Sequence, residues 1–98
     1  MTAYVLVDAQ VLDGERARGY RALAEPSIQL YGGRYLVQGT VPEVVEGTWP
    51  SSRVATVLEF PDMDRLKEWY ASAEYQEAKA VRGAAIELRM LFVEGKPA

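Results

Sequence analysis

The chain has 98 residues, of which 49% are hydrophobic, and its formal net charge is −3 at pH 7. At this length we expect one domain, residues 1–98, with a single packed core. The chain contains no cysteine and no histidine, which argues against disulfides, thiolate nucleophiles, serine hydrolase triads and zinc sites. We expect no metal and no cofactor. The basic residues are scattered singly, so nucleic-acid binding, which needs a concentrated basic face, is not expected.

The beginning of the chain lacks the basic and apolar regions of a signal peptide. No apolar run approaches the roughly 20 residues that a membrane helix needs. The lack of cysteine gives no sign of an oxidising compartment. We therefore expect a cytoplasmic protein that does not bind membranes.

The first half of the chain predicts a strand, a helix and a second strand. Residues 3–11 alternate in character as in a strand, and Asp8 stands on the mixed face. The other face is apolar and consists of Val5, Val7, Ala9 and Val11. Asp13 is a good N-cap for the helix, whose inward stripe includes Tyr20. Pro26 is expected to interrupt this helix, which restarts as a short turn over residues 26–31.

A pair of glycines, Gly32 and Gly33, ends the helical run and leads into the next strand. A glycine just past a helix end can take the left-handed conformation, and a second one lets the backbone reverse tightly. The second strand is predicted over residues 34–38. Residues 39–52 are less regular, and residues 43–46 are expected to extend the strand after a bulge.

The second half of the chain predicts a strand, a helix and a final strand. Residues 53–60 are rich in β-branched and apolar residues and are expected to form the central strand. Asp62 is expected to cap a helix with inward residues at helical spacing, namely Met63, Leu66, Trp69 and Tyr70. Ser72 resembles a second N-cap, so the helix should break near Ala71 and end at Gly83. The last strand is predicted over residues 87–93.

The order β-α-β-β-α-β predicts an α+β, ferredoxin-like fold, with a four-stranded antiparallel sheet and both helices on one face. Two helices cover only one face of such a sheet. The strands nevertheless offer large apolar side chains to the other face, and an exposed apolar face of this size usually marks a partner surface. We therefore predict a homodimer in which two sheets pack face to face.

Three segments resemble the DUF1330 family, a bacterial family within the dimeric α/β-barrel superfamily. They are Tyr31-Gly32-Gly33-Arg34-Tyr35-Leu36-Val37, Leu58-Glu59-Phe60-Pro61 and Trp69-Tyr70-Ala71-Ser72-Ala73-Glu74-Tyr75-Gln76. The resemblance runs over nearly the whole chain and implies a ferredoxin-like protomer in a dimeric barrel. The superfamily includes cofactor-independent monooxygenases, isomerases, cyclases, haem-handling proteins and stress-response proteins. The haem-handling members usually use a histidine ligand, which this chain lacks.

Three charged residues are candidates for chemistry. Asp8 lies within a strand, where a desolvated carboxylate needs a partner. It is either a structural hydrogen-bond acceptor or a solvated rim residue, or else an acid or base of raised pKa or a ligand anchor. Arg34 follows the glycine turn and could bind a carboxylate ligand or pair with Glu59 or Asp8. Glu59 stands near the end of the third strand, and the pattern does not assign it to either face.

The large aromatic residues are candidates for ligand contact or core packing. Trp69 and Tyr70 are consecutive and project about 100° apart on a helix, so one should be core and the other should reach a pocket edge. Trp49 and Tyr75 are the other two candidates. Ser72 is interpreted as a cap and not as a nucleophile, because no histidine exists to activate it.

These residues lead to two functional hypotheses. The first is a homodimer with an apolar pocket that binds an aromatic or polyketide-like ligand and catalyses a cofactor-free proton transfer, isomerisation or cyclisation. Asp8 would be the base and Arg34 the anion stabiliser, and Trp49, Glu59, Tyr70 and Tyr75 would contact the ligand. The alternative is a non-catalytic ligand-binding or stress-associated module. A purely structural role would predict a filled core without a cavity.

Overall fold

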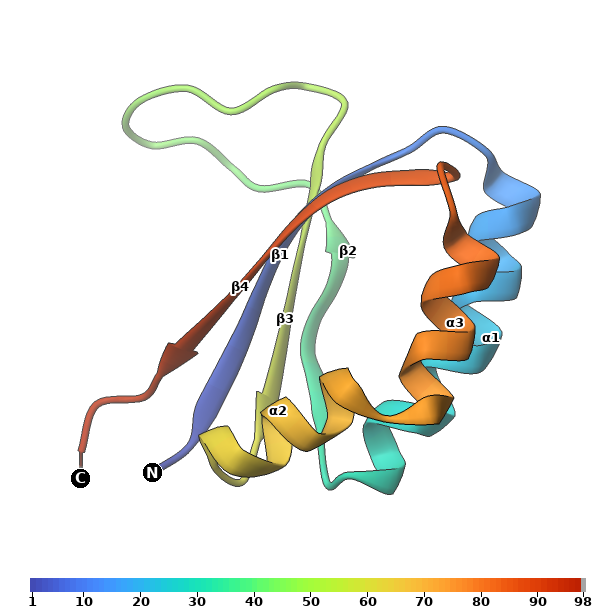
Figure 1. The fold of residues 1–98 in the computed structure, drawn as a ribbon. Coiled ribbons are helices and arrows are strands. Elements are labelled where there is room, and N and C mark those ends of the chain that lie inside the picture. The colour runs from blue at the N-terminus through green and yellow to red at the C-terminus, as the bar shows by residue number, and fades with distance from the viewer. Residues whose placement is uncertain (98) are drawn as a thin grey trace.

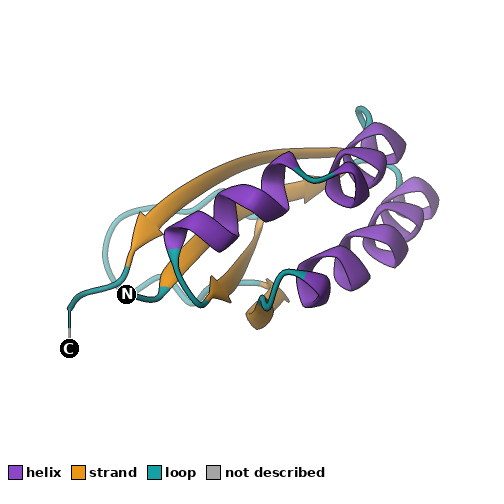
Figure 2. Cartoon of the chain, turned by 60° about the horizontal axis from the view of Figure 1, so that its bottom comes forward, coloured by secondary structure: helices purple, strands orange, loops and turns teal. Residues whose placement is uncertain are grey.

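The computed structural model describes residues 1–97 and contains one four-stranded sheet covered by helices on one face (Figures 1 and 2). The strand order is β2-β3-β1-β4, and every neighbouring pair is antiparallel. The predicted ferredoxin-like fold is therefore confirmed. The elements are β1 (Ala3–Val11), α1 (Gly14–Leu30), β2 (Arg34–Thr40), β3 (Val54–Phe60), α2 (Met63–Ala71), α3 (Ala73–Arg82) and β4 (Ile86–Glu94).

The two faces of β1 are used as its alternation predicts. Ala3, Val5 and Ala9 point towards the helices and are buried, while Leu6 on the opposite face is 38% exposed. Alternate residues of a strand point to opposite faces of the sheet. The apolar face of β1 therefore packs beneath the helices, and its mixed face lies on the uncovered side of the sheet. β1 and β3 both lie inside the sheet, because β1 pairs with β3 and β4, and β3 also pairs with β2.

The core is built around aromatic side chains between the sheet and the helices. Trp69 lies 5.2 Å from Phe60 and 4.4 Å from Tyr75, measured between ring centroids. All three are at most 1% exposed. The indole N–H of Trp69 donates to the hydroxyl of Ser27 at 3.0 Å, which connects α2 to α1. Large aromatic rings bury much area per residue, so this cluster carries a large share of the core.

The expected break at Pro26 is wrong, because α1 runs continuously from Gly14 to Leu30 with the proline inside it. Proline removes one helical hydrogen bond and costs roughly 3 kcal/mol in a helix interior. Ser27 and Ile28 follow it directly and are each only 2% exposed. The hydroxyl of Ser27 also donates to the carbonyl of Ala24 at 2.6 Å. Tertiary packing of this buried face keeps the helix continuous across the proline.

The glycine pair closes α1 with two hydrogen bonds. The N–H of Gly32 donates to the carbonyl of Gln29 at 3.0 Å, and that of Gly33 donates to Ile28 at 2.9 Å. Gly32 has φ +80°, the left-handed conformation that glycine adopts without strain. Gly33 is required for space, since a Cβ there would lie 2.6 Å from the ring of Phe60. The two glycines therefore serve different needs.

The predicted strand extension over residues 43–46 is also wrong, because these residues belong to an irregular connection between β2 and β3. Figure 1 shows this connection projecting beyond the end of the sheet. Pro42 cannot donate a backbone hydrogen bond, and the facing strand begins only at Val54, so the extension has no partner. The register between β2 and β3 instead shifts twice within β2 itself, between Tyr35 and Val37 and between Val37 and Thr40.

The predicted caps of the second helical region are confirmed. Asp62 accepts the N–H of Arg65 at 2.8 Å, and the Ser72 hydroxyl accepts the N–H of Tyr75 at 3.1 Å. Ser72 separates α2 from α3, and Gly83 ends α3 with φ +47°. The outer strands extend one or two residues past their predicted ends, as helix and strand boundaries commonly do.

Within residues 1–97, no helix has the length and apolar character needed to cross a membrane.

Candidate functional site

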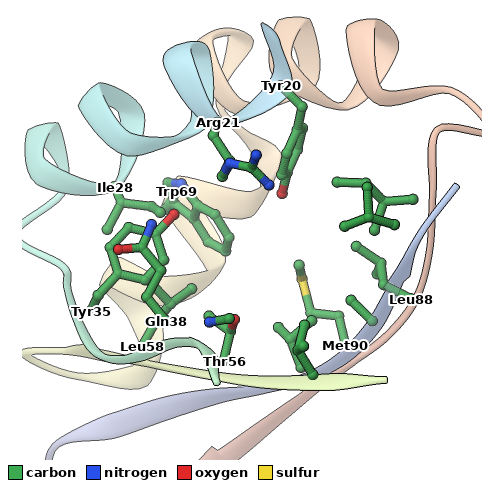
Figure 3. A pocket seen from close by; sticks show the side chains of 16 residues that line it. Tyr20, Arg21, Ile28, Tyr35, Gln38, Thr56, Leu58, Trp69, Leu88 and Met90 are labelled. Atoms are coloured by element: carbon green, nitrogen blue, oxygen red, sulfur yellow. The ribbon is translucent and has the colours of Figure 1, made fainter. Parts of the chain in front are cut away.

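A cavity of about 100 Å³ lies between α1 and the sheet (Figure 3). Its floor comes from the helix-facing positions of the strands, including Val7, Leu58, Leu88 and Met90. Ile28 of α1 and Trp69 of α2 close one end. The lining is mostly apolar, which is the usual character of a site for a small organic molecule.

The backbone of α1 lies close to that of α3, whereas α1 meets the sheet only through side chains, among them Ala24 and Ile28. Figure 1 shows the two helices side by side, with α1 away from the sheet. Side chains alone must then fill the space beneath α1. Two residues of the cavity floor, Ala9 and Gly39, are small and leave part of the space between the sheet and α1 unfilled. The open space is therefore a consequence of helix placement and of residue size.

Five polar side chains reach this mostly apolar space, and they are Tyr20, Arg21, Tyr35, Gln38 and Thr56. In Figure 3 the side chains of Tyr20 and Arg21 both extend from α1 towards the cavity. Burial raises the pKa of Tyr35 to about 12 and also raises the pKa of Tyr20, so both phenols are neutral hydrogen-bond donors near neutral pH. Of the described residues that line the cavity, none is Asp or Glu.

The hydroxyl of Tyr20 is linked to α3 by a hydrogen-bonded chain. It lies 3.0 Å from the hydroxyl of Tyr75, which accepts an N–H from Arg82 at 3.1 Å. The Arg82 guanidinium also lies 5.4 Å from the centroid of the Tyr20 ring. Burial raises the pKa of Tyr75 well above its usual value. The chain therefore connects a fixed positive charge to the wall of the cavity.

Asp8 lies on the opposite face of the sheet from this cavity. Its carboxylate accepts hydrogen bonds from Arg53 Nε at 2.6 Å and from Arg89 Nε at 2.9 Å. Burial alone would raise the pKa of Asp8, but the hydrogen bonds and positive charges of Arg89 and Arg53 outweigh it and hold the pKa below its usual value. A catalytic role for Asp8 stays a prediction, and its hydrogen bonds with Arg53 and Arg89 favour the structural alternative.

Arg34 and Glu59 are brought together on the same face as Asp8. They face each other across β2 and β3 and form a salt bridge, and both line a surface hollow of about 140 Å³ beside Thr2 and Pro61. Arg34 is largely exposed in this pair. Trp49 lies in the connection between β2 and β3, where its indole N–H donates to the carbonyl of Arg53 at 2.9 Å. None of these three residues lines the cavity under α1.

Tyr70 and Tyr75 pack against each other with ring centroids 5.4 Å apart, outside the cavity. Tyr70 is half-buried, and its hydroxyl accepts a hydrogen bond from Lys79 at 3.1 Å. Tyr75 is fully buried and reaches the cavity only through its hydrogen bond to Tyr20. The neighbouring Trp69 is the core residue of the predicted pair, and it also forms part of the cavity wall.

The cavity residues that the sequence analysis missed are Arg21, Tyr35, Gln38 and Thr56. Two signals were available for some of them. Thr56 alternates with Leu58 on the helix-facing side of β3, and Arg21 directly follows Tyr20, which was expected to face inward. Nothing in the pattern indicated that α1 stands away from the sheet.

Within residues 1–97 no three Asp or Glu side chains gather as a metal-binding group would require.

The fold and the cavity define a small α+β domain of the ferredoxin-like class, with an apolar cavity between its first helix and its sheet. Residues 2–96 match the family described as domain of unknown function DUF1330, and the chain belongs to this family. The predicted family is therefore confirmed. No curated protein gives a significant match to this chain.

Several solved structures share the fold. A protein of unknown function from Rhodopseudomonas palustris, RPA0582, is 20% identical, with a TM-score of 0.77 over 98% of this chain and 84% of that one. A putative antibiotic biosynthesis monooxygenase from Caulobacter crescentus is 14% identical, with a TM-score of 0.65 over 98% and 91%. SnoaB, a cofactor-independent oxygenase from Streptomyces nogalater, is 8% identical, with a TM-score of 0.65 over 99% and 95%. At these identities the likeness shows the fold alone.

Proposed function

We propose that this protein binds a small, largely apolar aromatic molecule in the cavity beneath α1. The cavity supports this proposal, because its floor is apolar and a few polar side chains also line it. Apolar surface supplies affinity, and a small number of placed donors supplies orientation. A filled core, as a purely structural role would require, does not match the space under α1. The volume of about 100 Å³ suits one compact ring system.

The proposal extends to cofactor-free chemistry on the bound molecule. SnoaB, described as a cofactor-independent oxygenase, shares the fold, and this likeness supports the proposal. The cavity supports it with two neutral phenols and an arginine that can polarise a carbonyl or phenolic oxygen. Oxygen uptake or product formation with any bound aromatic compound would distinguish an enzyme from a binding module.

If the protein binds a ligand in this cavity, the ligand should stabilise it against unfolding, and a variant with a filled cavity should lose that stabilisation. A fitting small phenol or aromatic ketone at about 100 times its dissociation constant should add roughly 2.7 kcal/mol to the free energy of unfolding, which is several degrees in Tm. Val54 lies on the cavity floor, so Val54→Phe should fill the space and remove this increase. A thermal-shift screen of both proteins measures the effect.

The matched control is Val45→Phe, since Val45 lies in the projecting connection and is 86% exposed. It makes the same change of side chain without touching the cavity, so its ligand-induced increase in Tm should equal that of the unchanged protein. An increase of the same size in Val54→Phe would show that the ligand binds elsewhere, and the proposed cavity function would then be wrong.

We also propose that the protein is a homodimer joined through the open face of its sheet. The centre of this face is apolar: Leu6 pairs with Val57 and Leu91, and Leu91 is 59% exposed. Salt bridges flank this centre, with Arg34 and Glu59 on one side. An apolar centre with a charged rim is the usual anatomy of a protein interface.

Leu91→Glu should convert such a dimer into a monomer, because it places a charge at the centre of the apolar contact. Leu30→Glu is the control, since Leu30 is exposed to a similar degree, 61%, but lies at the end of α1. Sedimentation equilibrium should give a dimer for the unchanged protein and for Leu30→Glu, and a monomer for Leu91→Glu. A monomer in all three would contradict the proposed interface.

A further inference from the structure

The hydrogen bonds between Tyr20, Tyr75 and Arg82 have a defined direction. Tyr75 is fully buried, and its hydroxyl has two partners within the described chain, Arg82 and Tyr20. A guanidinium has no acceptor, so Arg82 can only donate to the Tyr75 oxygen. A buried hydroxyl proton without an acceptor is costly, and the oxygen of Tyr20 is the acceptor within reach. Tyr75 therefore donates to Tyr20.

This direction leaves the proton of Tyr20 free to donate elsewhere. Each phenol carries one proton, and the proton between the two tyrosines belongs to Tyr75. Tyr20 lines the cavity, and its hydroxyl points into it (Figure 3). Hydrogen bonds in a chain polarise one another, so the charge of Arg82 strengthens the donor that Tyr20 offers. The cavity therefore contains a preset donor at a defined position.

Arg21 lines the same cavity, and its side chain extends towards it from the exposed side of α1 (Figure 3). The described lining itself contains no Asp or Glu, and the nearby charge of Glu25 acts on Tyr35, another residue of the lining. We propose, resting on the proposed aromatic-binding function, that Tyr20 and Arg21 form an oxyanion-binding pair. The ligand class is then an aromatic compound that binds through a phenolate or enolate oxygen, with Tyr75 and Arg82 as positioning residues for Tyr20.

The chemistry of the pair suits a delocalised anion. Burial raises the pKa of Tyr20, although the hydrogen bond from Tyr75 and the charge of Arg82 oppose this, so Tyr20 keeps its proton near neutral pH and can donate it. A hydrogen bond to a charged oxygen is stronger than one to a neutral oxygen. The apolar floor excludes water from the ring of the ligand, which strengthens the interaction with its charged oxygen.

The test compares 4-nitrophenolate with nitrobenzene, which has the same ring but no ionisable oxygen. Binding to the purified protein is measured by equilibrium dialysis at a pH where the phenol is ionised, and the absorbance of bound dye reports its protonation. We expect the phenolate to bind at least roughly tenfold more tightly than nitrobenzene, and the pKa of the bound phenol to fall. Tyr20→Phe should weaken phenolate binding by roughly 10- to 100-fold and leave nitrobenzene binding unchanged.

Further variants separate the roles of the pair. Arg21→Gln should also lower the preference for phenolate, and because Arg21 is exposed its replacement keeps the fold even where Tyr20→Phe does not. Arg18→Gln is the control, since Arg18 is an exposed arginine of α1 that does not line the cavity. Tyr75→Phe should reduce the phenolate preference less than Tyr20→Phe, because Tyr75 acts only through Tyr20.

The outcomes separate this inference from the function on which it rests. If neither probe binds, the proposed aromatic-binding function fails and the oxyanion pair fails with it. If both probes bind equally well, the cavity function stands and the oxyanion pair is wrong. If the phenolate preference survives both Tyr20→Phe and Arg21→Gln, other groups bind the anion and the assignment to this pair is wrong.

Discussion

Replacement of Trp69 by alanine should lower the free energy of unfolding by about 3–5 kcal/mol. Trp69 is 1% exposed, packs on Phe60 and Tyr75, and donates a hydrogen bond to Ser27. The change removes the largest buried ring and leaves a cavity that helices on a fixed sheet cannot fully close. For a domain of this size the fall in Tm should exceed about 10 °C, measured by thermal or urea unfolding.

The matched comparison is Trp49→Ala in the connection between β2 and β3. Trp49 is only half-buried and makes one hydrogen bond, to Arg53, so its removal should cost markedly less than that of Trp69. Equal losses at the two positions would contradict the assignment of Trp69 to the centre of the core. Trp69→Phe should recover part of the loss, because it keeps an aromatic ring in the cluster.

Asp8→Asn should destabilise the protein by about 2 kcal/mol at pH 7 through the loss of charged hydrogen bonds to Arg53 and Arg89. The Arg53 side chain is 9% exposed, so it retains a positive charge with little access to water. Removing the charge of one partner lowers the free energy of unfolding by more than the intact ion pair contributes to it. The reason is that the remaining buried charge has no opposite charge beside it. Urea unfolding at pH 7 measures the difference.

The effect should depend on pH with a defined sign. The folded pKa of Asp8 lies below the ordinary value of 3.8, so its ion pairs contribute fully above that pH and are lost as the pH falls through the folded pKa. The stability difference between the two proteins should therefore be largest near neutral pH and shrink below about pH 4. A difference that grows in acid would contradict this account.

The same variant tests the earlier hypothesis that Asp8 is a catalytic base. That hypothesis predicts loss of turnover with an intact, equally stable fold. The ion-pair interpretation predicts a less stable protein whose cavity still binds its ligand, because Asp8 lies on the far face of the sheet. Unfolding and ligand binding measured on one preparation of Asp8→Asn distinguish the two.

Local signals predicted most of the fold. The alternation around Val5, the caps Asp62 and Ser72 and the glycine pair each depend on a few neighbouring residues, and each is present as predicted. The two errors, at Pro26 and over residues 43–46, arose where distant contacts outweigh local preference. Burial of Ser27 and Ile28 keeps a helix that the proline disfavours. The lack of a facing strand removes an extension that the valines favour.

The candidate site could be predicted far less well. The sequence indicated an apolar pocket but selected polar residues by their chemical type, and the six selected residues lie outside the cavity. Asp8 and Glu59 are on the open face, where arginines from neighbouring strands pair with them. Which residues share a face across strands depends on register, and register is set by pairing over long distances in the chain.

The amino-acid sequence by itself determined the family, the order of elements and the inward face of β1, because these follow from local periodicity, caps and turns. Only the tertiary structure decided that α1 packs on α3 and leaves a cavity beneath it, and that Tyr20, Tyr75 and Arg82 form one chain of hydrogen bonds. The reason is physical: a cavity is defined by how far two packed elements stand apart, and the sequence pattern of neither element contains that distance.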